Sequence, residues 1–528
     1  MADRNWQRIC PVDAIVPDTG VCALVDGKQI AIFRLDDGTV RAIDNHDPFS
    51  GANVLSRGIV GGLEGERVVA SPIYKQHFSL ATGRCLEDAG NSVDAYPVKV
   101  EDGDIWLEAV PKRRYLPPAP QPEEPASLVV VGNGMVAMRA VEELLDRAPA
   151  RYRITVFGAE PRGSYNRIQL SSVLSGEQDA EAVTTHPSKW YADNAITFHA
   201  GDAVVAIDRT RRCVRSASGR EVEYDRLLIA TGSDPLIPPI DGAELDGVTT
   251  FRDLDDVDAL IAASAERRRA VVIGGGLLGL EAASGLCARG MDVTVLHLAD
   301  HLMERQLDVK AGTMLKATLA ERGIRVRLGA ETRRIAGSAG RVERVELADG
   351  TSVPADLVVI AIGIRPNIAL ARDAGLACGR GVLVNDTLQT FDPRIYAVGE
   401  CVEHRGSTYG LVAPLYEQAG ICAGQLAGEG GKGYRGSVSG TQLKISGVKV
   451  YSAGDINGDE DTEDLVLHDP RRGLYKRLIL RSNRVVGTVL FGDTDDGPWY
   501  FDLIRTGADV SAMRSRLLFG AAYCEEAA

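Results

Sequence analysis

Residues 128–145 read LVVVGNGMVAMRAVEELL and predict a buried β-strand, a tight glycine turn and then a helix. The turn places Gly132, Gly134 and Ala137 in G-x-G-x-x-A spacing. Gly132 permits the tight turn, and Gly134 has no Cβ, so a pyrophosphate can approach the backbone at the positive end of the helix. Ala137 allows the helix to pack closely on the strand. The stretch therefore predicts a dinucleotide-binding fold.

The segment that follows has the acid that such a fold requires. A second strand is expected at residues 153–157 and ends shortly before Glu160. That position suits a carboxylate that accepts hydrogen bonds from the adenosine ribose of the bound dinucleotide.

A second copy of the motif is present in AVVIGGGLLGLEAASGL, where Gly274, Gly276 and Gly279 follow an expected strand at residues 270–273. The next strand is expected at residues 292–296. An NAD site usually has an acid after this strand, but this chain has His297, so the choice between NADH and NADPH stays open. One glycine cluster can be an incidental turn, whereas two clusters in one chain favour two nucleotide sites.

The composition is that of an ordinary globular protein and excludes several function classes. The 528 residues carry 59 basic and 73 acidic side chains, a net charge of −14, so neither nucleic acid nor a membrane is an expected partner. The N-terminal residues lack the apolar stretch of a secretory signal, and the nine cysteines form no C-x-x-C pair. We expect free thiols, no metal site and a cytoplasmic location.

The chain is expected to contain four structural units, because the hydrophobic pattern changes several times along it. Short alternating runs with Asp-Gly turns at Asp26, Asp37 and Asp102 predict a small all-β domain, and a proline-rich run predicts a linker. The apolar runs that flank Ser482 and Asn483 predict a hairpin, followed by a helix around residues 499–505. The expected units are a β domain at 1–112, an FAD domain at 127–248 and 364–432, an NAD(P) domain at 249–363, and an α+β domain at 433–528, with the linker at 113–126 between the first two.

The order of these motifs resembles the two-dinucleotide-binding flavoprotein superfamily. Residues 225–235, DRLLIATGSDP, and 361–367, AIGIRPN, look like the two crossings between its FAD and NAD domains, and residues 390–401, TFDPRIYAVGEC, look like its second FAD motif. The family more often has Asp where this chain has Glu400. The resemblance implies turn or cofactor-binding positions at Thr231, Gly232, Gly363, Gly399 and Glu400.

A narrower resemblance is to the flavin-bearing front half of the large subunit of NAD(P)H-dependent assimilatory nitrite reductase. It rests on residues 128–145, on FGAEPRGSYNRIQLSSVLSG at 157–176, on HLMERQLD at 301–308 and on TYGLVAP at 408–414. It implies Arg167 as a further cofactor-binding residue. The related peroxidases and disulfide reductases have a cysteine soon after the first motif, but the matching stretch here has Ser175, which argues against thiol chemistry.

The first 110 residues resemble the Rieske-like small subunit of the same enzyme, through residues 43–60 and 71–88. True Rieske domains bind a [2Fe–2S] cluster through C-x-H and C-x-x-H. The corresponding positions here are Asp44 with His46 and Ser71 with Tyr74, so three of the four ligands are missing. We expect no cluster, and interpret His46 as a surface or core histidine and the domain as a docking or assembly unit.

The resemblance implies FAD, NADH or NADPH, and hydride transfer from nicotinamide C4 to flavin N5. Glu281 is expected either near the nicotinamide or as a buried paired carboxylate, and residues 409–418 should start a helix whose N-terminus faces the flavin. The expected acceptor is a redox partner protein, a cluster-, molybdenum- or sirohaem-bearing subunit of nitrate or nitrite assimilation. A reductase for a ferredoxin or Rieske-type oxygenase system and a nucleotide-sensing assembly flavoprotein remain alternatives.

Overall fold

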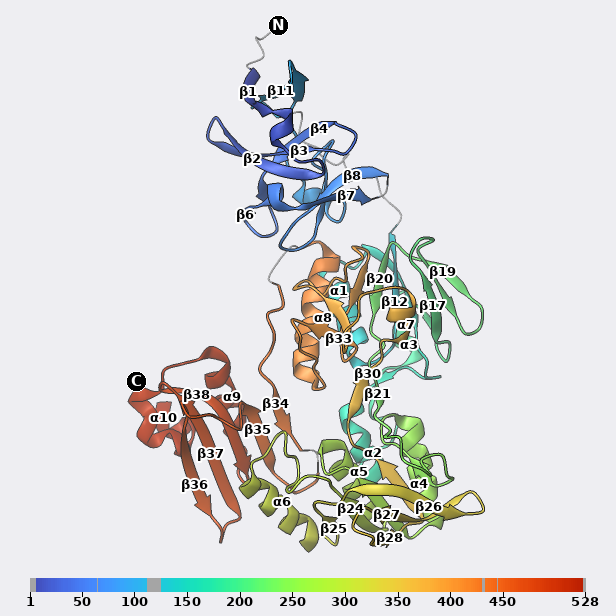
Figure 1. The fold of residues 1–528 in the computed structure, drawn as a ribbon. Coiled ribbons are helices and arrows are strands. Elements are labelled where there is room, and N and C mark those ends of the chain that lie inside the picture. The colour runs from blue at the N-terminus through green and yellow to red at the C-terminus, as the bar shows by residue number, and fades with distance from the viewer. Residues whose placement is uncertain (1–5, 64, 112–124, 430–432, 444, 526–528) are drawn as a thin grey trace.

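The computed structural model describes residues 6–63, 65–111, 125–429, 433–443 and 445–525, and arranges them as four units (Figure 1). A β unit lies at one end of the molecule, an FAD-type unit lies in the middle, and a second sheet–helix unit lies at the other end beside the C-terminal unit. Residues 112–124, most of the predicted linker at 113–126, lie outside the described residues.

The N-terminal unit is a set of small antiparallel sheets around strand β3 (Lys28–Arg34). Because side chains alternate along a strand, Ala31 and Phe33 enter one apolar cluster while Ile30 and Ile32 enter another. The predicted all-β domain is confirmed. Its other strands are β1 (Trp6–Pro11), β2 (Thr19–Val25), β4 (Val40–Asp44), β5 (His46–Asp47), β6 (Ala52–Asn53), β7 (Ile59–Leu63), β8 (Glu66–Ala70), β9 (His77–Ser79), β10 (Val98–Glu101) and β11 (Asp104–Glu108).

The FAD-type unit has a parallel sheet in the order β16-β13-β12-β20-β32, with helices α1 and α8 packed together beside it (Figure 1). Its central strand β12 is buried on both faces, as the continuous apolar run predicts. The elements are β12 (Ala126–Val131), α1 (Met135–Arg147), β13 (Tyr152–Phe157), β14 (Ser164–Tyr165), α2 (Leu170–Ser175), β15 (Thr184–His186), α3 (Ser188–Asp193), β16 (Thr197–His199), β17 (Val204–Asp208), β18 (Cys213–Ser216), β19 (Glu221–Glu223), β20 (Arg226–Ile229), α7 (Ala369–Asp373), β31 (Val382–Val384), β32 (Ile395–Ala397), β33 (Val402–His404) and α8 (Val412–Ala427).

The second sheet–helix unit is inserted between β20 and β32, and the chain enters and leaves it through one antiparallel pair, β21 (Ser233–Pro235) with β30 (Ile364–Pro366). Its parallel sheet has the order β22-β29-β23-β24-β25. The elements are β22 (Val248–Thr249), α4 (Leu254–Glu266), β23 (Arg269–Ile273), α5 (Leu277–Ala288), β24 (Asp292–Leu296), α6 (Val309–Glu321), β25 (Arg325–Arg327), β26 (Thr332–Ser338), β27 (Arg341–Leu347), β28 (Ser352–Pro354) and β29 (Leu357–Ile360).

The C-terminal unit is a five-stranded antiparallel sheet covered by helix α9. The hairpin expected at Ser482 and Asn483 is present, and both residues adopt positive φ angles, 48° and 57°, as a two-residue turn requires. Tyr475 of this sheet donates to Asp308 at the start of α6 over 2.7 Å, which ties the unit to the second sheet–helix unit. The elements are β34 (Gly440–Gln442), β35 (Val450–Gly454), β36 (Glu463–Asp469), β37 (Leu474–Arg481), β38 (Arg484–Phe491), α9 (Gly497–Thr506) and α10 (Ala521–Glu525).

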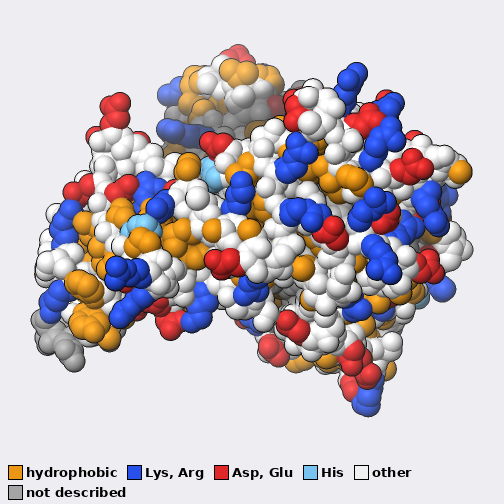
Figure 2. Space-filling view, turned by 90° about the horizontal axis from the view of Figure 1, so that it is seen from below, with side chains coloured by type: hydrophobic (Ala, Val, Ile, Leu, Met, Phe, Trp, Pro, Cys, Tyr) orange, Lys and Arg blue, Asp and Glu red, His pale blue; other side chains and the backbone are white. Residues whose placement is uncertain are grey.

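The surface in Figure 2 carries basic and acidic side chains interspersed with one another, and no broad field of one sign covers this face. Within the described residues, no helix is long and apolar enough to cross a membrane.

Candidate functional site

The two glycine turns have the same geometry. Gly132 has φ 111° and Gly274 has φ 122°, and a Cβ on either would lie 2.2 Å from a backbone oxygen of the neighbouring strand end, that of Ala230 or Ala361. Only glycine fits such a position. Each turn is therefore held against the strand beside it, and the helix that follows starts at a fixed place.

The second glycine of each G-x-G motif meets open space. Gly134 and Gly276 cap helices α1 and α5, and a Cβ on either would have no atom within 4 Å. The unpaired backbone N–H groups of each helix start face this space and suit a pyrophosphate. The residues present therefore fit two dinucleotides, one per sheet–helix unit.

The third position of each motif sets how closely helix and strand pack. A Cβ on Gly279 would lie 2.1 Å from the oxygen of Gly274, so this position also requires glycine. Ala137, at the same place in the first motif, is buried with its methyl group in the core.

Three turns from distant parts of the sequence meet at one edge of the first sheet. Strands β12, β20 and β32 are neighbours and parallel, so the turns that follow them lie together. These turns contain Gly132, then Thr231 and Gly232, then Gly399 and Glu400. The hydroxyl of Thr231 donates to the backbone oxygen of Asn367 over 2.7 Å, and the N–H of Gly399 donates to Oε1 of Gln418 over 3.1 Å.

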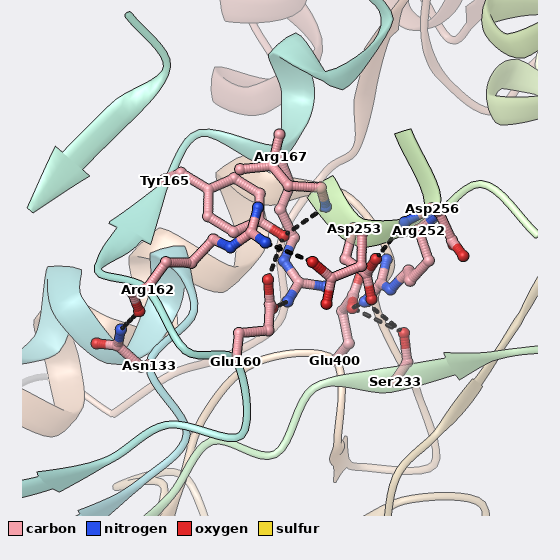
Figure 3. Close-up of polar contacts among 12 residues, drawn as sticks. Asn133, Glu160, Arg162, Tyr165, Arg167, Ser233, Arg252, Asp253, Asp256 and Glu400 are labelled. Atoms are coloured by element: carbon pink, nitrogen blue, oxygen red, sulfur yellow. Dashed lines mark hydrogen bonds and ion pairs between the residues drawn. The ribbon is translucent and has the colours of Figure 1, made fainter. Parts of the chain in front are cut away.

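Two carboxylates at this edge have basic partners, shown in Figure 3. Glu160 forms an ion pair with Arg167 and accepts a 2.8 Å hydrogen bond from the hydroxyl of Tyr165. Glu400 forms an ion pair with Arg252 and accepts a 2.8 Å hydrogen bond from Ser233. The structure brings both acids to one edge of the first sheet, where their cofactor roles stay predictions, and no sequence motif points to Arg252.

Arg252 belongs to the second sheet–helix unit, so its pairing with Glu400 crosses between the two units. Its Nε is buried and has no hydrogen-bond partner within the described residues. A second ion pair, Arg162 with Asp255, also crosses the boundary, and the N–H of Leu254 donates to the Tyr165 hydroxyl over 3.3 Å. Burial raises the pKa of Tyr165, so this hydroxyl keeps its proton.

Glu281 is buried on helix α5 and interacts with another group of the protein. It lies one helical turn before Gly285, whose backbone packs against Leu174 of α2 in the FAD-type unit. Glu281 therefore lies on the face of α5 that packs against α2, whose Leu174 shares a buried apolar cluster with α4 and α5. Its predicted position near the nicotinamide stays a prediction. Gly363 has φ 132° and open space around it, at the return crossing.

The cysteines do not form a thiol site at this edge. Cys401 follows Glu400 directly, and burial raises the pKa of its thiol, which therefore stays protonated and unreactive. Ser175, where related enzymes have a cysteine, donates to the backbone oxygen of Ser172 over 3.1 Å.

Comparison with known proteins decides the family. Residues 126–419, more than half of the chain, match the model of the pyridine nucleotide-disulphide oxidoreductases. The chain belongs to this family. Residues 5–108 match the Rieske-like [2Fe-2S] domain and residues 440–508 match the C-terminal domain of rubredoxin NAD⁺ reductase. The predicted class, an FAD-dependent NAD(P)H oxidoreductase with an N-terminal Rieske-like domain, is confirmed.

Three relatives illustrate the likeness. The chain is 50% identical over 384 residues to nitrite reductase [NAD(P)H] of Bacillus subtilis, covering 73% of this chain and 48% of that protein. It is 42% identical over 391 residues to the assimilatory nitrate reductase electron transfer subunit of the same organism, covering 74% and 51%. The ferredoxin reductase for the CYP199A2 system of Rhodopseudomonas palustris is 27% identical, with a TM-score of 0.66 over 72% of this chain and 100% of that one. The chain spans about half the length of the two Bacillus proteins.

Residues at the positions where true Rieske domains have cluster ligands interact with other groups of this protein. Asp44 accepts a 2.7 Å hydrogen bond from Tyr96, and Ser71 donates to Asp47 over 2.6 Å. The ring of His46 lies 3.2 Å from the side-chain oxygen of Asn53. Within the part of the chain that the structure describes, no group of three His, Cys, Asp or Glu side chains could hold a metal ion.

Substitution of Gly134 tests the pyrophosphate position. Gly134→Val should weaken FAD binding by at least about tenfold, the equivalent of about 1.4 kcal/mol, because the side chain fills space that the dinucleotide needs, whereas its Cβ has no protein atom within 4 Å. The dissociation constant is measured by flavin fluorescence, and thermal unfolding should change little. Gly132→Val is the contrasting variant and should lower the unfolding temperature. A Gly134→Val protein that binds FAD normally would contradict the assignment.

The cross-unit ion pair can be tested by a double-mutant cycle. Arg252→Leu should destabilise the protein by about 2 kcal/mol, because it leaves the partly buried Glu400 carboxylate without a cation. Adding Glu400→Gln should restore most of the loss, as followed by thermal unfolding. The exposed pair of Lys189 and Asp193 is the control, and Lys189→Leu should have almost no effect. An equal loss of stability in Arg252→Leu and in the double variant Arg252→Leu, Glu400→Gln would argue against the pairing.

Proposed function

We propose that this chain takes electrons from NAD(P)H through FAD and delivers them to a separate redox protein of nitrate or nitrite assimilation. The observation that carries the proposal is the pair of matching glycine turns, each with open space where a pyrophosphate would lie. One turn belongs to each sheet–helix unit, and the two units share a boundary crossed by Arg252 and Arg162. Two dinucleotides bound side by side are what a hydride transfer between them requires.

Bound FAD would accept a hydride from nicotinamide and release the electrons to an acceptor. The chain's own residues position and enclose this chemistry. Under the proposal, Glu160 and Glu400 hold the adenosine ribose and the ribityl chain, with Arg167 and Arg252 orienting their carboxylates. Helix α8 begins at Val412, and its unpaired N–H groups would stabilise negative charge on the reduced ring.

The nitrogen-assimilation part of the proposal is supported by relatives. One Bacillus subtilis protein is named a nitrite reductase and the other an electron transfer subunit of nitrate reductase. A cluster-, molybdenum- or sirohaem-bearing subunit is the corresponding acceptor. All nine cysteines are free thiols, which supports a reducing, cytoplasmic setting as part of the same proposal.

The Rieske-like domain would act as a docking unit away from the electron path. The side chain of Asn385 donates to the backbone oxygen of Tyr74 over 3.2 Å, and Arg226 donates to that of Glu87 over 3.3 Å. Arg226 is the first residue of β20, so the domain contacts the sheet edge opposite to the glycine turns. The adjacent strand β12 has six residues, which separate the two edges by about 20 Å.

Steady-state turnover distinguishes an electron carrier from a nucleotide-sensing assembly protein. The purified protein should show a flavin spectrum and should reduce ferricyanide with NADH or NADPH at rates of at least about 1 s⁻¹. Slow turnover with a long-lived complex would instead favour the assembly alternative. Reduction of a cluster-bearing nitrite reductase subunit, but not of an oxygenase ferredoxin, would separate the preferred acceptor from the ferredoxin alternative.

Weakening the contact between the Rieske-like domain and the FAD-type unit should not change the rate of ferricyanide reduction. The double variant Arg226→Ala, Asn385→Ala removes these two described side-chain hydrogen bonds to that domain. We expect faster limited proteolysis between the two units and unchanged ferricyanide reduction, because the sheet edge involved is remote from the glycine turns. A large fall in ferricyanide reduction with the flavin still bound would contradict the remote placement.

A further inference from the structure

His297 faces the second glycine turn from the end of strand β24. Its ring is buried, with 7% of the residue exposed, and Nδ1 accepts a 3.0 Å hydrogen bond from the backbone N–H of Gly275. A nitrogen that accepts a hydrogen bond carries no proton. The imidazole is therefore the neutral form with its proton on Nε2.

The Nε2 proton is directed at a carboxylate. Nε2 lies 3.1 Å from Oε2 of Glu304, and 39% of the Glu304 side chain is exposed. Because the imidazole is neutral, it orients this carboxylate without cancelling its charge. Glu304 therefore presents a negative charge that is anchored on one side and open on the other.

The loop that carries Glu304 is fixed to the same turn. The N–H of Met303 donates to the backbone oxygen of Gly275 over 3.0 Å, and the side chains of Leu302 and Met303 are fully buried. Gly275 thus uses its N–H for His297 and its oxygen for Met303. These bonds hold the loop that carries Glu304 against the glycine-turn backbone that would bind a pyrophosphate.

We propose that Glu304, oriented by His297, is the residue that binds the adenosine ribose of the nicotinamide nucleotide and selects NADH over NADPH. Nucleotide-binding folds usually place this acid directly after the second strand, where it accepts hydrogen bonds from the ribose hydroxyls. Here that position is occupied by a histidine turned toward the glycine turn, and the acid comes from seven residues further on. The inference rests on the proposed nucleotide site and adds its specificity.

Nearby basic groups provide the competing possibility. Arg327, on the neighbouring strand β25, already donates to Thr351 over 2.9 Å and lies 3.5 Å from the carboxylate of Asp349. Arg305 is exposed beside Glu304 and would favour a 2′-phosphate if it dominated the site. Variants of both Glu304 and Arg305 therefore distinguish the two possibilities.

Binding of ADP-ribose and of 2′-phospho-ADP-ribose to the purified flavoprotein tests the inference by calorimetry, because these ligands report the adenosine end without any turnover. We expect ADP-ribose to bind about 100-fold more tightly, from repulsion between the carboxylate and the 2′-phosphate. Glu304→Gln should reduce this ratio to about tenfold or less, and Glu304→Lys should reverse it. His297→Ala should weaken ADP-ribose binding less than Glu304→Lys does, since it removes only the orientation of the acid.

Glu321→Gln, an exposed carboxylate at the end of α6, is the matched control and should leave the ratio unchanged. Equal binding of the two ligands by the wild type would overturn the inference while leaving the nucleotide site in place. So would an affinity ratio that changes in Arg305→Ala but not in Glu304→Gln. Binding of neither ligand would instead contradict the proposed function itself. Flavin reduction by NADH and NADPH should follow the same order as binding.

Discussion

The close contact between each glycine turn and a backbone carbonyl at the end of the neighbouring strand determines where the two nucleotide-binding helices begin. A side chain at Gly132 or Gly274 would have to overlap a backbone oxygen, at 2.2 Å in both cases. That constraint fixes where helices α1 and α5 begin and which way their N–H groups point. The open space at Gly134 and Gly276, where the two pyrophosphates would lie, depends on this placement.

Parallel strand order explains how residues from distant parts of the chain reach these sites. The carboxyl ends of β12, β20 and β32 lie side by side, so turns near residues 132, 231 and 399 share one edge. The pairing of Glu400 with Arg252 then joins this edge to the inserted unit. Under the proposed function, Glu400 would contact the cofactor as well as pair with Arg252, and cofactor binding would then be coupled electrostatically to the placement of the two units.

Much of the fold could be predicted from local sequence. Continuous apolar runs before glycine turns gave β12 and β23 their correct places, and Ser482-Asn483 marked the hairpin because both residues tolerate positive φ angles. These features depend on neighbours in the chain. The motifs also point to Glu160 and Glu400, because each acid follows a glycine turn at a short or family-typical spacing, and their cofactor roles stay predictions.

Other features depend on contacts between distant segments and could not be found in this way. Arg252 lies in no motif, and its pairing with Glu400 depends on how the inserted unit folds back. The sequence shows a histidine where an acid is usual, but the bonds of His297 to Gly275 and Glu304 depend on the geometry of the loop. The placement of the Rieske-like domain on the far sheet edge likewise depends on tertiary packing, and the linker sequence carries no signal for it.

The central claim is that nicotinamide and flavin react with each other across the boundary between the two sheet–helix units. Anaerobic mixing of the purified flavoprotein with NADH in a stopped-flow instrument tests this most directly. The account predicts that the flavin absorbance bleaches in a single turnover within about a second, before any acceptor is added. A flavin that stays oxidised for minutes with saturating NADH, and equally with NADPH, would contradict it.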